Sequence, residues 1–433
     1  MKTPTMGLIK TSAILSTLAL PGLAWSAGFS IVEQNVSGLG NAYAGSAAVS
    51  NDASTVFFNP AGMTQLNGNT GSFALHAITP SAKFSNGNTR YGGGGTVSGG
   101  NGGDAGGTEL VPNAYYVTNI GSATKFGIGI SAPYGLTTEY DKSWVGRYQA
   151  VKSQLKTVNF NPSLAFSVAG GWSLGFGMNL QYADATLSNV VDFGTISGNP
   201  AGSLDGFAEI TGDSWAMGYN TGILFAPSQS AKIGFSYRSK VKHKLEGQSN
   251  FTIPAPLAAT PIAIAFANSD ATANLTLPET ASLSSVQMVT PKIQLLGDIT
   301  LTKWSRLNEL KVEYSNPNTP TTVEEMHWKD TFKYSVGINY LANQNFTYRG
   351  GFAFDEGAAP NSTYRSPRVP DNDRTWLALG LGYKQGTMSF DFGYVHIMID
   401  DTAINRTNAL GQTLNGTYDL SVNIISAQVN YNF

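Results

Sequence analysis

The side chains that most often carry out catalysis are few and scattered in this chain. It contains no cysteine and only four histidines, which are His76, His243, His327 and His396. A hydrolase needs a nucleophile or an acid held next to such a histidine. Because the four histidines fall on separate predicted strands or loops, we nominate no catalytic residue. An enzyme such as a phospholipase is a rival interpretation, which an assay on the purified protein would decide.

Nucleotide, metal and nucleic-acid sites find no support either. The glycine-rich stretch YGGGGTVSGGNGGDAGG, residues 91–107, lacks the Lys-Ser/Thr ending and the flanking helix of a phosphate-binding loop. We interpret it as a flexible external loop. The lack of cysteine excludes disulfides and Cys-ligated metals. The net charge is −2 and Lys and Arg are not clustered, so nucleic acid is not an expected partner. We expect no cofactor and no metal.

The composition indicates an exported protein that is not a typical soluble one. Charged residues make up 12% of the 433 residues, about half the usual share. Glycine occurs 49 times, and aromatic residues reach 11%. Residues 1–26 contain a basic start, the apolar run TSAILSTLALPGLA and the small residues of AWS, which predict a signal peptide cleaved before Ala27. A short membrane anchor is the alternative interpretation.

Alternation of apolar and polar residues predicts strands that face lipid. In WSLGFGMNLQYA, residues 172–183, every second side chain is apolar and the others are small or polar. TWLALGLGY, residues 375–383, repeats the pattern. A secreted sandwich also alternates, but it seldom sustains such long strands with aromatic residues at the ends of the apolar band. Beyond the signal peptide, no apolar run is long enough for a spanning helix.

The sequence therefore predicts an all-β fold, a 14-stranded antiparallel transmembrane β-barrel over residues 71–433. Tight turns alternate with long loops, as in barrels of the outer membrane of Gram-negative bacteria. The chain ends in QVNYNF, and a terminal aromatic such as Phe433 resembles the signal that the barrel-assembly machinery reads during biogenesis. The predicted strands are residues 71–84, 108–119, 125–140, 154–168, 172–191, 213–226, 231–249, 274–289, 292–314, 322–342, 345–356, 374–385, 388–404 and 416–433.

Residues 27–70 do not alternate, and they predict a small N-terminal helical hatch that plugs the lumen. A fourteen-stranded barrel has an interior too wide for its own side chains to fill. A disordered tail is the alternative, but the apolar residues of this segment argue against it. An Asn-Pro pair followed by small residues is typical of a turn that starts a helix. The residues concerned are Asn59, Pro60, Ala61 and Gly62.

The third predicted strand contains SAPYGLTTEY, residues 131–140, which conflicts with regular pairing. Pro133 cannot donate a ladder hydrogen bond, and Gly135 permits a bend. We expect a kink or break here, and an ordinary bulge is the alternative.

Several motifs in order resemble one known family. AGFSIVEQNVSGLGNAYAG, NPAGM, APYGLTTEY, NLTLPE, GFAFDE, PDNDRTWLALG and the aromatic C-terminus together cover nearly the whole mature chain. This set is similar to the FadL-type outer-membrane transporters of long-chain fatty acids and hydrocarbons. The resemblance implies fourteen strands, a hatch and passive uptake of hydrophobic compounds. It also implies that the kink leaves a lateral opening, formed here by Ala132, Pro133, Tyr134 and Gly135.

The resemblance further implies a substrate pocket that holds the mature N-terminus, at Ala27, Gly28 and Phe29. In the fatty-acid member of the family, basic side chains in this pocket face the substrate carboxylate. The shared motifs place Asn189 and Glu324 at those positions, and neither is basic. A buried Glu324 would repel a carboxylate. Long-chain fatty acids are the first expectation, and uncharged hydrocarbons such as alkanes or toluene are the alternative.

The apolar loop FTIPAPLAATPIAIAFA, residues 251–267, predicts an external capture groove, because exposed apolar patches tend to mark binding surfaces. A loop that packs on itself is the alternative. The proposed groove consists of Phe251, Ile253, Leu257, Ile262, Ile264 and Phe266. Expected partners are the hydrophobic substrates, outer-membrane lipid and lipopolysaccharide, and we expect a monomer. A general diffusion porin and a binding-only adhesin are remaining rivals.

Overall fold

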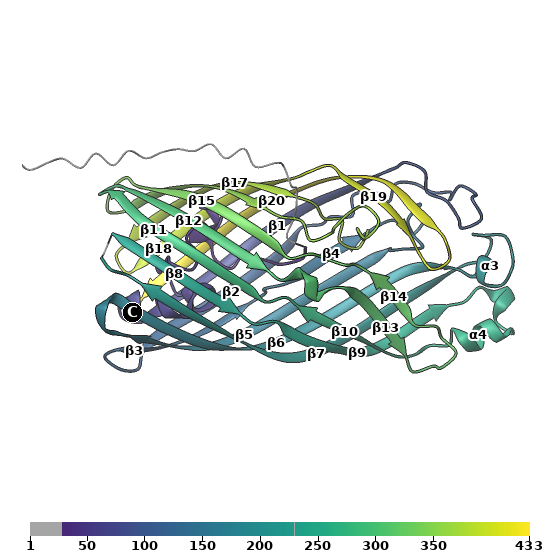
Figure 1. Cartoon of the computed structure of the whole chain (residues 1–433), viewed down its shortest axis with the longest axis horizontal. Coiled ribbons are helices and arrows are strands. Elements are labelled where there is room, and N and C mark those ends of the chain that lie inside the picture. The colour runs from purple at the N-terminus through teal and green to yellow at the C-terminus, as the bar shows by residue number, and fades with distance from the viewer. Residues whose placement is uncertain (1–27, 229) are drawn as a thin grey trace, which may run out of the picture.

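The computed structural model describes residues 28–228 and 230–433 of the chain. Its strands close into a single antiparallel barrel of fourteen strands, because the first strand, β1 (Thr70–Asn86), pairs along its whole length with the last, β20 (Thr413–Asn432). Closure pairs the first strand with the last, so the sheet has no free edge strand, as crossing lipid with strands requires. Figure 1 shows the cylinder, with the tight turns and the C-terminus at one end and the long loops at the other. The predicted fold class is thus confirmed.

In the part of the chain that the structure describes, some barrel strands are continuous and others are interrupted. The continuous ones besides β1 and β20 are β2 (Glu109–Asn119), β5 (Lys152–Ser167), β6 (Trp172–Asp192), β7 (Asp205–Phe225), β16 (Phe346–Asp355) and β17 (Arg374–Gln385). The interrupted ones are β3 (Thr124–Ser131) with β4 (Gly135–Glu139), β8 (Ala231–Arg238) with β9 (Val241–Thr252), β10 (Ser269–Leu277) with β11 (Thr280–Thr290), β12 (Ile293–Thr302) with β13 (Glu309–Tyr314), β14 (Thr322–Glu325) with β15 (Thr331–Leu341), and β18 (Met388–Ile399) with β19 (Thr402–Thr407).

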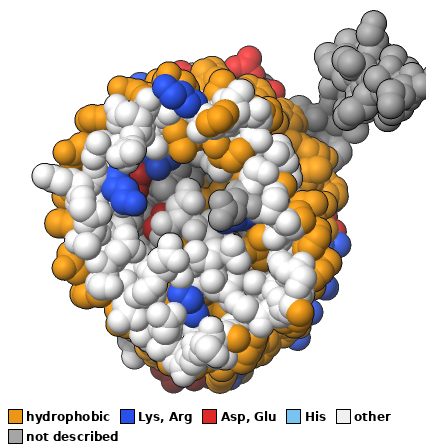
Figure 2. Space-filling view, turned by 90° about the vertical axis from the view of Figure 1, so that its left-hand side faces the viewer, with side chains coloured by type: hydrophobic (Ala, Val, Ile, Leu, Met, Phe, Trp, Pro, Cys, Tyr) orange, Lys and Arg blue, Asp and Glu red, His pale blue; other side chains and the backbone are white. Residues whose placement is uncertain are grey.

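The alternation in the sequence corresponds to the two faces of the wall. In β6, Trp172, Phe176 and Met178 are about half exposed on the outside, whereas Ser173 and Asn179 are buried in the lumen. In a membrane, these apolar side chains would contact lipid, which is the stable arrangement for a transmembrane strand. Figure 2, which looks into the end with the tight turns, shows hydrophobic side chains around the outer face and a mostly polar recess within.

Two predicted loops contain more strand than the sequence analysis expected. The sequence predicts a loop over residues 192–212, but β7 already begins at Asp205 and pairs there with the end of β6. Likewise β10 begins at Ser269, five residues before the predicted position, and pairs with β9. These extensions continue the wall towards the long loops. Their residues lack a continuous apolar face, so the alternation rule could not detect them.

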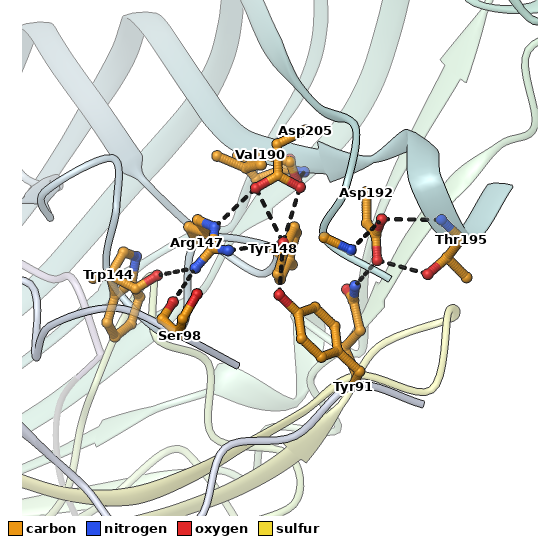
Figure 3. Close-up of polar contacts among 12 residues, drawn as sticks. Tyr91, Ser98, Trp144, Arg147, Tyr148, Val190, Asp192, Thr195 and Asp205 are labelled. Atoms are coloured by element: carbon orange, nitrogen blue, oxygen red, sulfur yellow. Dashed lines mark hydrogen bonds and ion pairs between the residues drawn. The ribbon is translucent and has the colours of Figure 1, made fainter. Parts of the chain in front are cut away.

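The external loops are tied together by a buried arginine, Arg147 (Figure 3). Its Nη1 donates to the carbonyl of Ser98 at 2.7 Å, and its Nε lies 3.2 Å from the carboxylate of Asp205. Tyr148 donates to the same carboxylate at 2.9 Å. One side chain thus connects the loop after β1, the loop after β4 and the start of β7. The long loops at this end of the barrel also contain three short helices, α3 (Phe193–Ile196), η3 (Ala255–Leu257) and α4 (Pro261–Ala265).

The described residues before β1 form the hatch, with α1 (Val36–Leu39), α2 (Thr55–Phe58) and η1 (Pro60–Gln65). Asn59 caps η1 by accepting from the N–H of Ala61 at 3.0 Å, and it donates to the carbonyl of Ile223 in β7 at 3.1 Å. A side chain at Gly175 in β6 would overlap the backbone of Pro60 and Ala61. The wall therefore needs glycine at that position for the hatch backbone to approach.

The remaining short helices are η2 (Ala169–Gly171) in a tight turn and η4 (Trp304–Arg306) between β12 and β13. Within the described ranges, none of the helices has the length and hydropathy needed to span a membrane.

Candidate functional site

The barrel wall is broken at the third strand. β3 pairs with β2 up to Ala114 and Ile130, and β4 pairs with β5 but has no partner on its other side among the described pairings. Residues 132–134 separate β3 from β4. Beyond Ala114, β2 pairs only with β1 in the described wall. An unpaired stretch therefore lies between β2 and β4, and Pro133 stands at its start, where the missing N–H costs no ladder bond.

The hatch segment at the N-terminus occupies this break. Ile31 donates to the carbonyl of Pro133 at 2.9 Å, and Gly135 donates to the carbonyl of Phe29 at 3.1 Å, so that Ser30 forms an antiparallel bridge with Tyr134. These bonds satisfy backbone groups that the kink leaves unpaired.

Two amide side chains fix the same segment. Gln34 donates from Nε2 to the carbonyl of Ala132 at 3.0 Å, and Asn113 in β2 donates to the carbonyl of Glu33 at 2.9 Å. Both sides of the break are thus bonded to the hatch, one through β2 and the other through the kink itself.

An ion pair holds the first described residue. The N–H of Gly28 donates to Asp371 at 3.0 Å, its carbonyl accepts from Arg374 at 2.9 Å, and Arg374 and Asp371 lie 2.8 Å apart. Gly28 has φ +57°, and a Cβ there would lie 2.8 Å from both Trp304 and Trp328. Glycine is therefore required both for the backbone angle and for the space.

A cavity of about 490 Å³ lies beside the break. Its lining includes all four kink residues, Ala132, Pro133, Tyr134 and Gly135, and the hatch residues Gly28 to Glu33. Leu110 and Pro112 of β2 border it on the other side of the break. The cavity therefore adjoins the stretch of wall that lacks strand pairing.

A second, smaller cavity of about 90 Å³ lies towards the long loops, and its lining is mainly apolar. Phe29, Leu136, Leu155 and Val369 line both cavities. The ring of Phe29 packs edge-on against Trp304, with centroids 4.9 Å apart. Phe29 is 7% exposed and contributes to the linings of both cavities. The other apolar side chains of the second cavity are Ala185, Leu187, Ile210, Leu245, Ala271, Ala273, Leu275, Leu307, Leu310, Val312 and Met326.

The polar lining of the second cavity centres on a charged group. Glu324 lies 3.1 Å from Arg368 and 3.7 Å from Arg406, and it accepts a hydrogen bond from Ser366. Two arginines therefore offset the charge of Glu324, on which the expected repulsion of a carboxylate rests. Together the three side chains carry one net positive charge.

Some of the other residues predicted for the pocket line a cavity, and others do not. Asn189 donates to the carbonyl of Val190 at 2.9 Å and lies outside the linings of both cavities. Gly28 and Phe29 line the first cavity. Ala27 and the predicted signal peptide lie outside the described residues.

The residues of the predicted capture groove lie on the loop that contains η3 and α4. Phe266 packs against Phe193 and Phe251, with ring centroids 5.0 Å and 5.4 Å away, and Leu257 is buried. Ile253 and Ile262 are partly buried, and Ile264 is 65% exposed. The loop therefore combines self-packing with an exposed apolar tip.

Sequence reasoning missed several residues on or around the cavity linings. It nominated neither Arg368 and Arg406, which pair with Glu324, nor Trp304 and Trp328, which pack around Phe29. The motif PDNDR contains Asp371 and Arg374, the ion pair that holds Gly28. The motif alone does not indicate this contact with a residue far away in the sequence.

A closed barrel with an internal hatch, apolar chambers and a broken wall defines an outer-membrane channel for hydrophobic solutes. Comparison with known proteins agrees. Residues 17–433 match the family model described as outer membrane protein transport protein (OMPP1/FadL/TodX). The chain is 30% identical over 407 residues to the long-chain fatty acid transport protein of Salmonella typhi, covering 89% of this chain and 91% of that one.

Solved structures show the same architecture. A FadL homologue from Pseudomonas aeruginosa superposes with a TM-score of 0.88 at 25% identity, covering 94% of this chain and 100% of that one. The toluene transporter TodX of Pseudomonas putida has a TM-score of 0.69 at 14% identity, covering 91% and 98%.

The chain belongs to the FadL/TodX family of outer-membrane transport proteins. It is a transporter of hydrophobic compounds in the outer membrane of a Gram-negative bacterium, and its family is one of channels rather than enzymes.

Proposed function

We propose that this protein takes up long-chain fatty acids passively across the outer membrane. The observation that carries the proposal is the pair of apolar cavities that share Phe29 in their linings, one with the Arg368–Glu324–Arg406 group in its surroundings and the other beside the wall break. An alkyl chain gains about 0.8 kcal/mol for each methylene that leaves water. A net positive group next to an apolar chamber suits a ligand with an apolar tail and an acidic head.

The proposed route runs from the loops to the wall. An apolar solute first adsorbs on the external loop around Ile264, where the exposed apolar surface supports capture. It then enters the second cavity and displaces Phe29 from the tryptophans. The residues before β1 rearrange, and the ligand leaves sideways through the break between β2 and β4. No energy source is needed, because each step moves apolar surface away from water.

The N-terminal segment is the proposed link between occupancy and opening. Phe29 lines both cavities, and its carbonyl bonds to Gly135 in the break. A ligand that moves the ring therefore also pulls on the bond that closes the wall. Ala27, Gly28 and Phe29 are the coupling residues in this proposal, and Asn59, Pro60, Ala61 and Gly62 are the part of the hatch that moves.

Uncharged hydrocarbons are the second candidate. The observation that favours them is the lining of the second cavity, where apolar side chains outnumber charged ones and Glu324 already neutralises one arginine. The structurally similar TodX is a toluene transporter, but at 14% identity this likeness concerns the fold alone.

Uptake by a strain that lacks its own transporter of this family tests the proposal. Cells carrying this gene or an empty vector receive labelled oleate, an alkane or toluene. Faster uptake of oleate alone supports the fatty-acid proposal, whereas faster uptake of toluene or the alkane alone favours the hydrocarbon candidate. If none of the three enters faster than with the empty vector, the proposed uptake function is wrong.

A further inference from the structure

The end of the barrel with the tight turns carries lysines that belong to none of the sites described above. Short turns mark the periplasmic end of an outer-membrane barrel. Figure 2 looks into this end and shows Lys and Arg side chains around the recess. Four lysines at this end form what we call the lysine ring. They are Lys125 near the start of β3, Lys232 near the start of β8, Lys292 in the turn before β12 and Lys384 near the end of β17.

Two lysines of the ring lie against the hatch. Lys232 is on the same face of β8 as Gly234, where an added Cβ would overlap the backbone of Ala47 in the hatch. Lys125 donates from its Nζ to the carbonyl of Leu66, which also belongs to the hatch. Both side chains therefore face the lumen and point away from lipid.

The other two lysines are exposed at the mouth of the lumen. Lys384 is on the same face of β17 as Gly380, where an added Cβ would lie 2.8 Å from the Cα of Gly40 in the hatch. The carbonyl of Lys292 accepts a hydrogen bond from the N–H of Leu341 at 2.8 Å, which fixes its backbone, and its side chain is exposed. Both are therefore accessible from the periplasm.

Few negative groups offset the lysine ring. The tight turns at residues 120–123, 169–171, 226–230, 290–292, 342–345 and 386–387 contain no Asp or Glu, and residues 59–69 of the hatch carry no charge. Asp391 is paired with Arg349 at 2.7 Å, and Asp52 is buried, where it accepts from Ser37. The C-terminal carboxylate is the remaining negative group. Among the described residues, none of the four lysines takes part in an ion pair.

The spacing of the ring suits an extended ligand with several negative charges. Only β11 lies between β8 and β12, whereas β15 and β16 separate β12 from β17. With about 4.8 Å between neighbouring strands, the backbone of Lys292 lies about 10 Å from that of Lys232 and about 14 Å from that of Lys384. An extended peptide advances about 3.4 Å per residue, so about five residues span the longer distance. Like charges around a mouth also reinforce one another's field.

The orientation of the side chains decides between two classes of anionic partner. Anionic lipid head groups surround the outer face of a barrel, where outward-facing side chains would meet them. The lysine ring faces the lumen instead, and a soluble chain can enter this mouth from the periplasm. The structure therefore favours an acidic peptide segment over a lipid.

We propose that the lysine ring docks an acidic segment of a periplasmic protein at the mouth of the lumen. The segment lies across the mouth in extended form. Its carboxylates pair with Lys292 and Lys384 at the rim and with Lys232 nearer the hatch. The proposal does not depend on which solute the barrel takes up.

Binding of a model acidic peptide to the purified full-length protein in detergent tests the docking. The probe is fluorescein-labelled deca-glutamate, followed by fluorescence anisotropy, and deca-glutamine with the same label is the neutral comparison. We expect deca-glutamate alone to bind, and Lys292→Gln with Lys384→Gln to weaken its binding about tenfold. The matched control is Lys244→Gln with Lys311→Gln, which removes two exposed lysines on strands β9 and β13 and should leave the affinity unchanged. Added salt should weaken binding by the wild type.

The position of the peptide is measured separately by thiol labelling. The chain has no cysteine, so Thr387→Cys introduces a single thiol in the exposed turn after β17, and Thr252→Cys introduces one at the end of β9 near the long loops. Deca-glutamate should slow maleimide labelling of Thr387→Cys and leave the labelling of Thr252→Cys unchanged. Deca-glutamine should protect neither thiol.

Undiminished binding of deca-glutamate by the Lys292→Gln and Lys384→Gln double variant would overturn the proposal, and so would an equal loss in the control pair. If the double variant instead lost affinity only for vesicles that contain phosphatidylglycerol, the partner would be a lipid and the proposal would be wrong. Should the double variant fail to assemble, unprotected labelling of Thr387→Cys in the presence of deca-glutamate would overturn it. Uptake does not enter these measurements, so either proposal can fail while the other stands.

Discussion

The backbone N–H of Ile31 donates a hydrogen bond to the carbonyl of Pro133, with 2.9 Å between the two atoms. These residues are about a hundred positions apart, yet one lies in the hatch and the other in the break of the wall. The hatch therefore does more than fill the lumen, because its first residues complete a strand position that the barrel itself leaves empty. Any motion of this segment changes the wall and the cavities together.

Replacing Gly28 by alanine should unseat the N-terminal segment. The added Cβ would meet both Trp304 and Trp328 at 2.8 Å, and the residue would keep an unfavourable positive φ. We expect Phe29 to leave the tryptophans and oleate uptake to fall several-fold. Tryptophan fluorescence and uptake measure the two effects. Gly93→Ala is the control, since nothing lies within 4 Å of a Cβ there, and equal behaviour of the two variants would argue against a role for the segment.

Substitution of Gly175 should detach the hatch without destroying the barrel. A methyl group at this position would overlap the backbone of Pro60 and Ala61, whereas a Cβ at Gly297 would meet only Ser285 at an ordinary 3.5 Å. We therefore expect Gly175→Ala to raise ion conductance in planar bilayers and Gly297→Ala to leave it unchanged. Both variants should still show heat-modifiable migration on gels. A silent Gly175→Ala channel would mean that the hatch does not block the lumen.

The charge of Glu324 should tune head-group preference in the second cavity. Glu324→Gln removes the negative charge from between Arg368 and Arg406, so oleate should bind about threefold to tenfold more tightly, while oleyl alcohol should not respond. Arg368→Gln should have the opposite effect. The exposed neighbour Glu325 supplies the control Glu325→Gln. If oleate affinity is the same in all three variants, its carboxylate does not lie near this group.

Asp373 should make the protein less stable as the pH rises. Its side chain is 1% exposed, and neither carboxylate oxygen has a hydrogen-bond donor among the described residues. Burial, aided by the charge of Asp400, raises the pKa of Asp373 from an ordinary 3.8 to about 7, although Lys329 opposes the shift. Between these two values the folded chain keeps a proton that the unfolded chain releases, so stability falls through this window and is level above it.

Urea unfolding at pH 5 and pH 8 measures this effect. The wild type should be less stable at pH 8, and Asp373→Asn should show a smaller difference between the two conditions. Asp419→Asn, at an exposed aspartate, is the control. The same pH dependence in wild type and Asp373→Asn would show that the buried carboxyl contributes nothing.

Much of the fold follows from local patterns in the sequence. The alternation around Trp172 and the proline at Pro133 act through their own strands, so the fourteen-stranded barrel and the position of the irregularity were predictable, and the barrel is confirmed. Where strands extend beyond the lipid, as at the start of β7, no apolar face is required and the pattern is lost.

The composition of the site was predicted less well, since it depends on contacts between distant segments. Gly28 and Asp371 are 343 residues apart, and Glu324 meets Arg368 only because the connection after β16 folds over the lumen. The family motifs identified Glu324 as a lining residue, but its neutralisation by two arginines requires the folded loops.

Straightening the third strand tests the lateral route most directly. Pro133→Val with Gly135→Val restores a donor and removes the flexible position, so β3 and β4 can pair continuously with β2. The matched control is Pro162→Val, which makes the same change in the regular strand β5. Oleate uptake is then measured in cells where each variant assembles as a heat-modifiable barrel. The account predicts that the double variant loses uptake and the control retains it. Normal uptake by the straightened barrel would contradict a lateral exit.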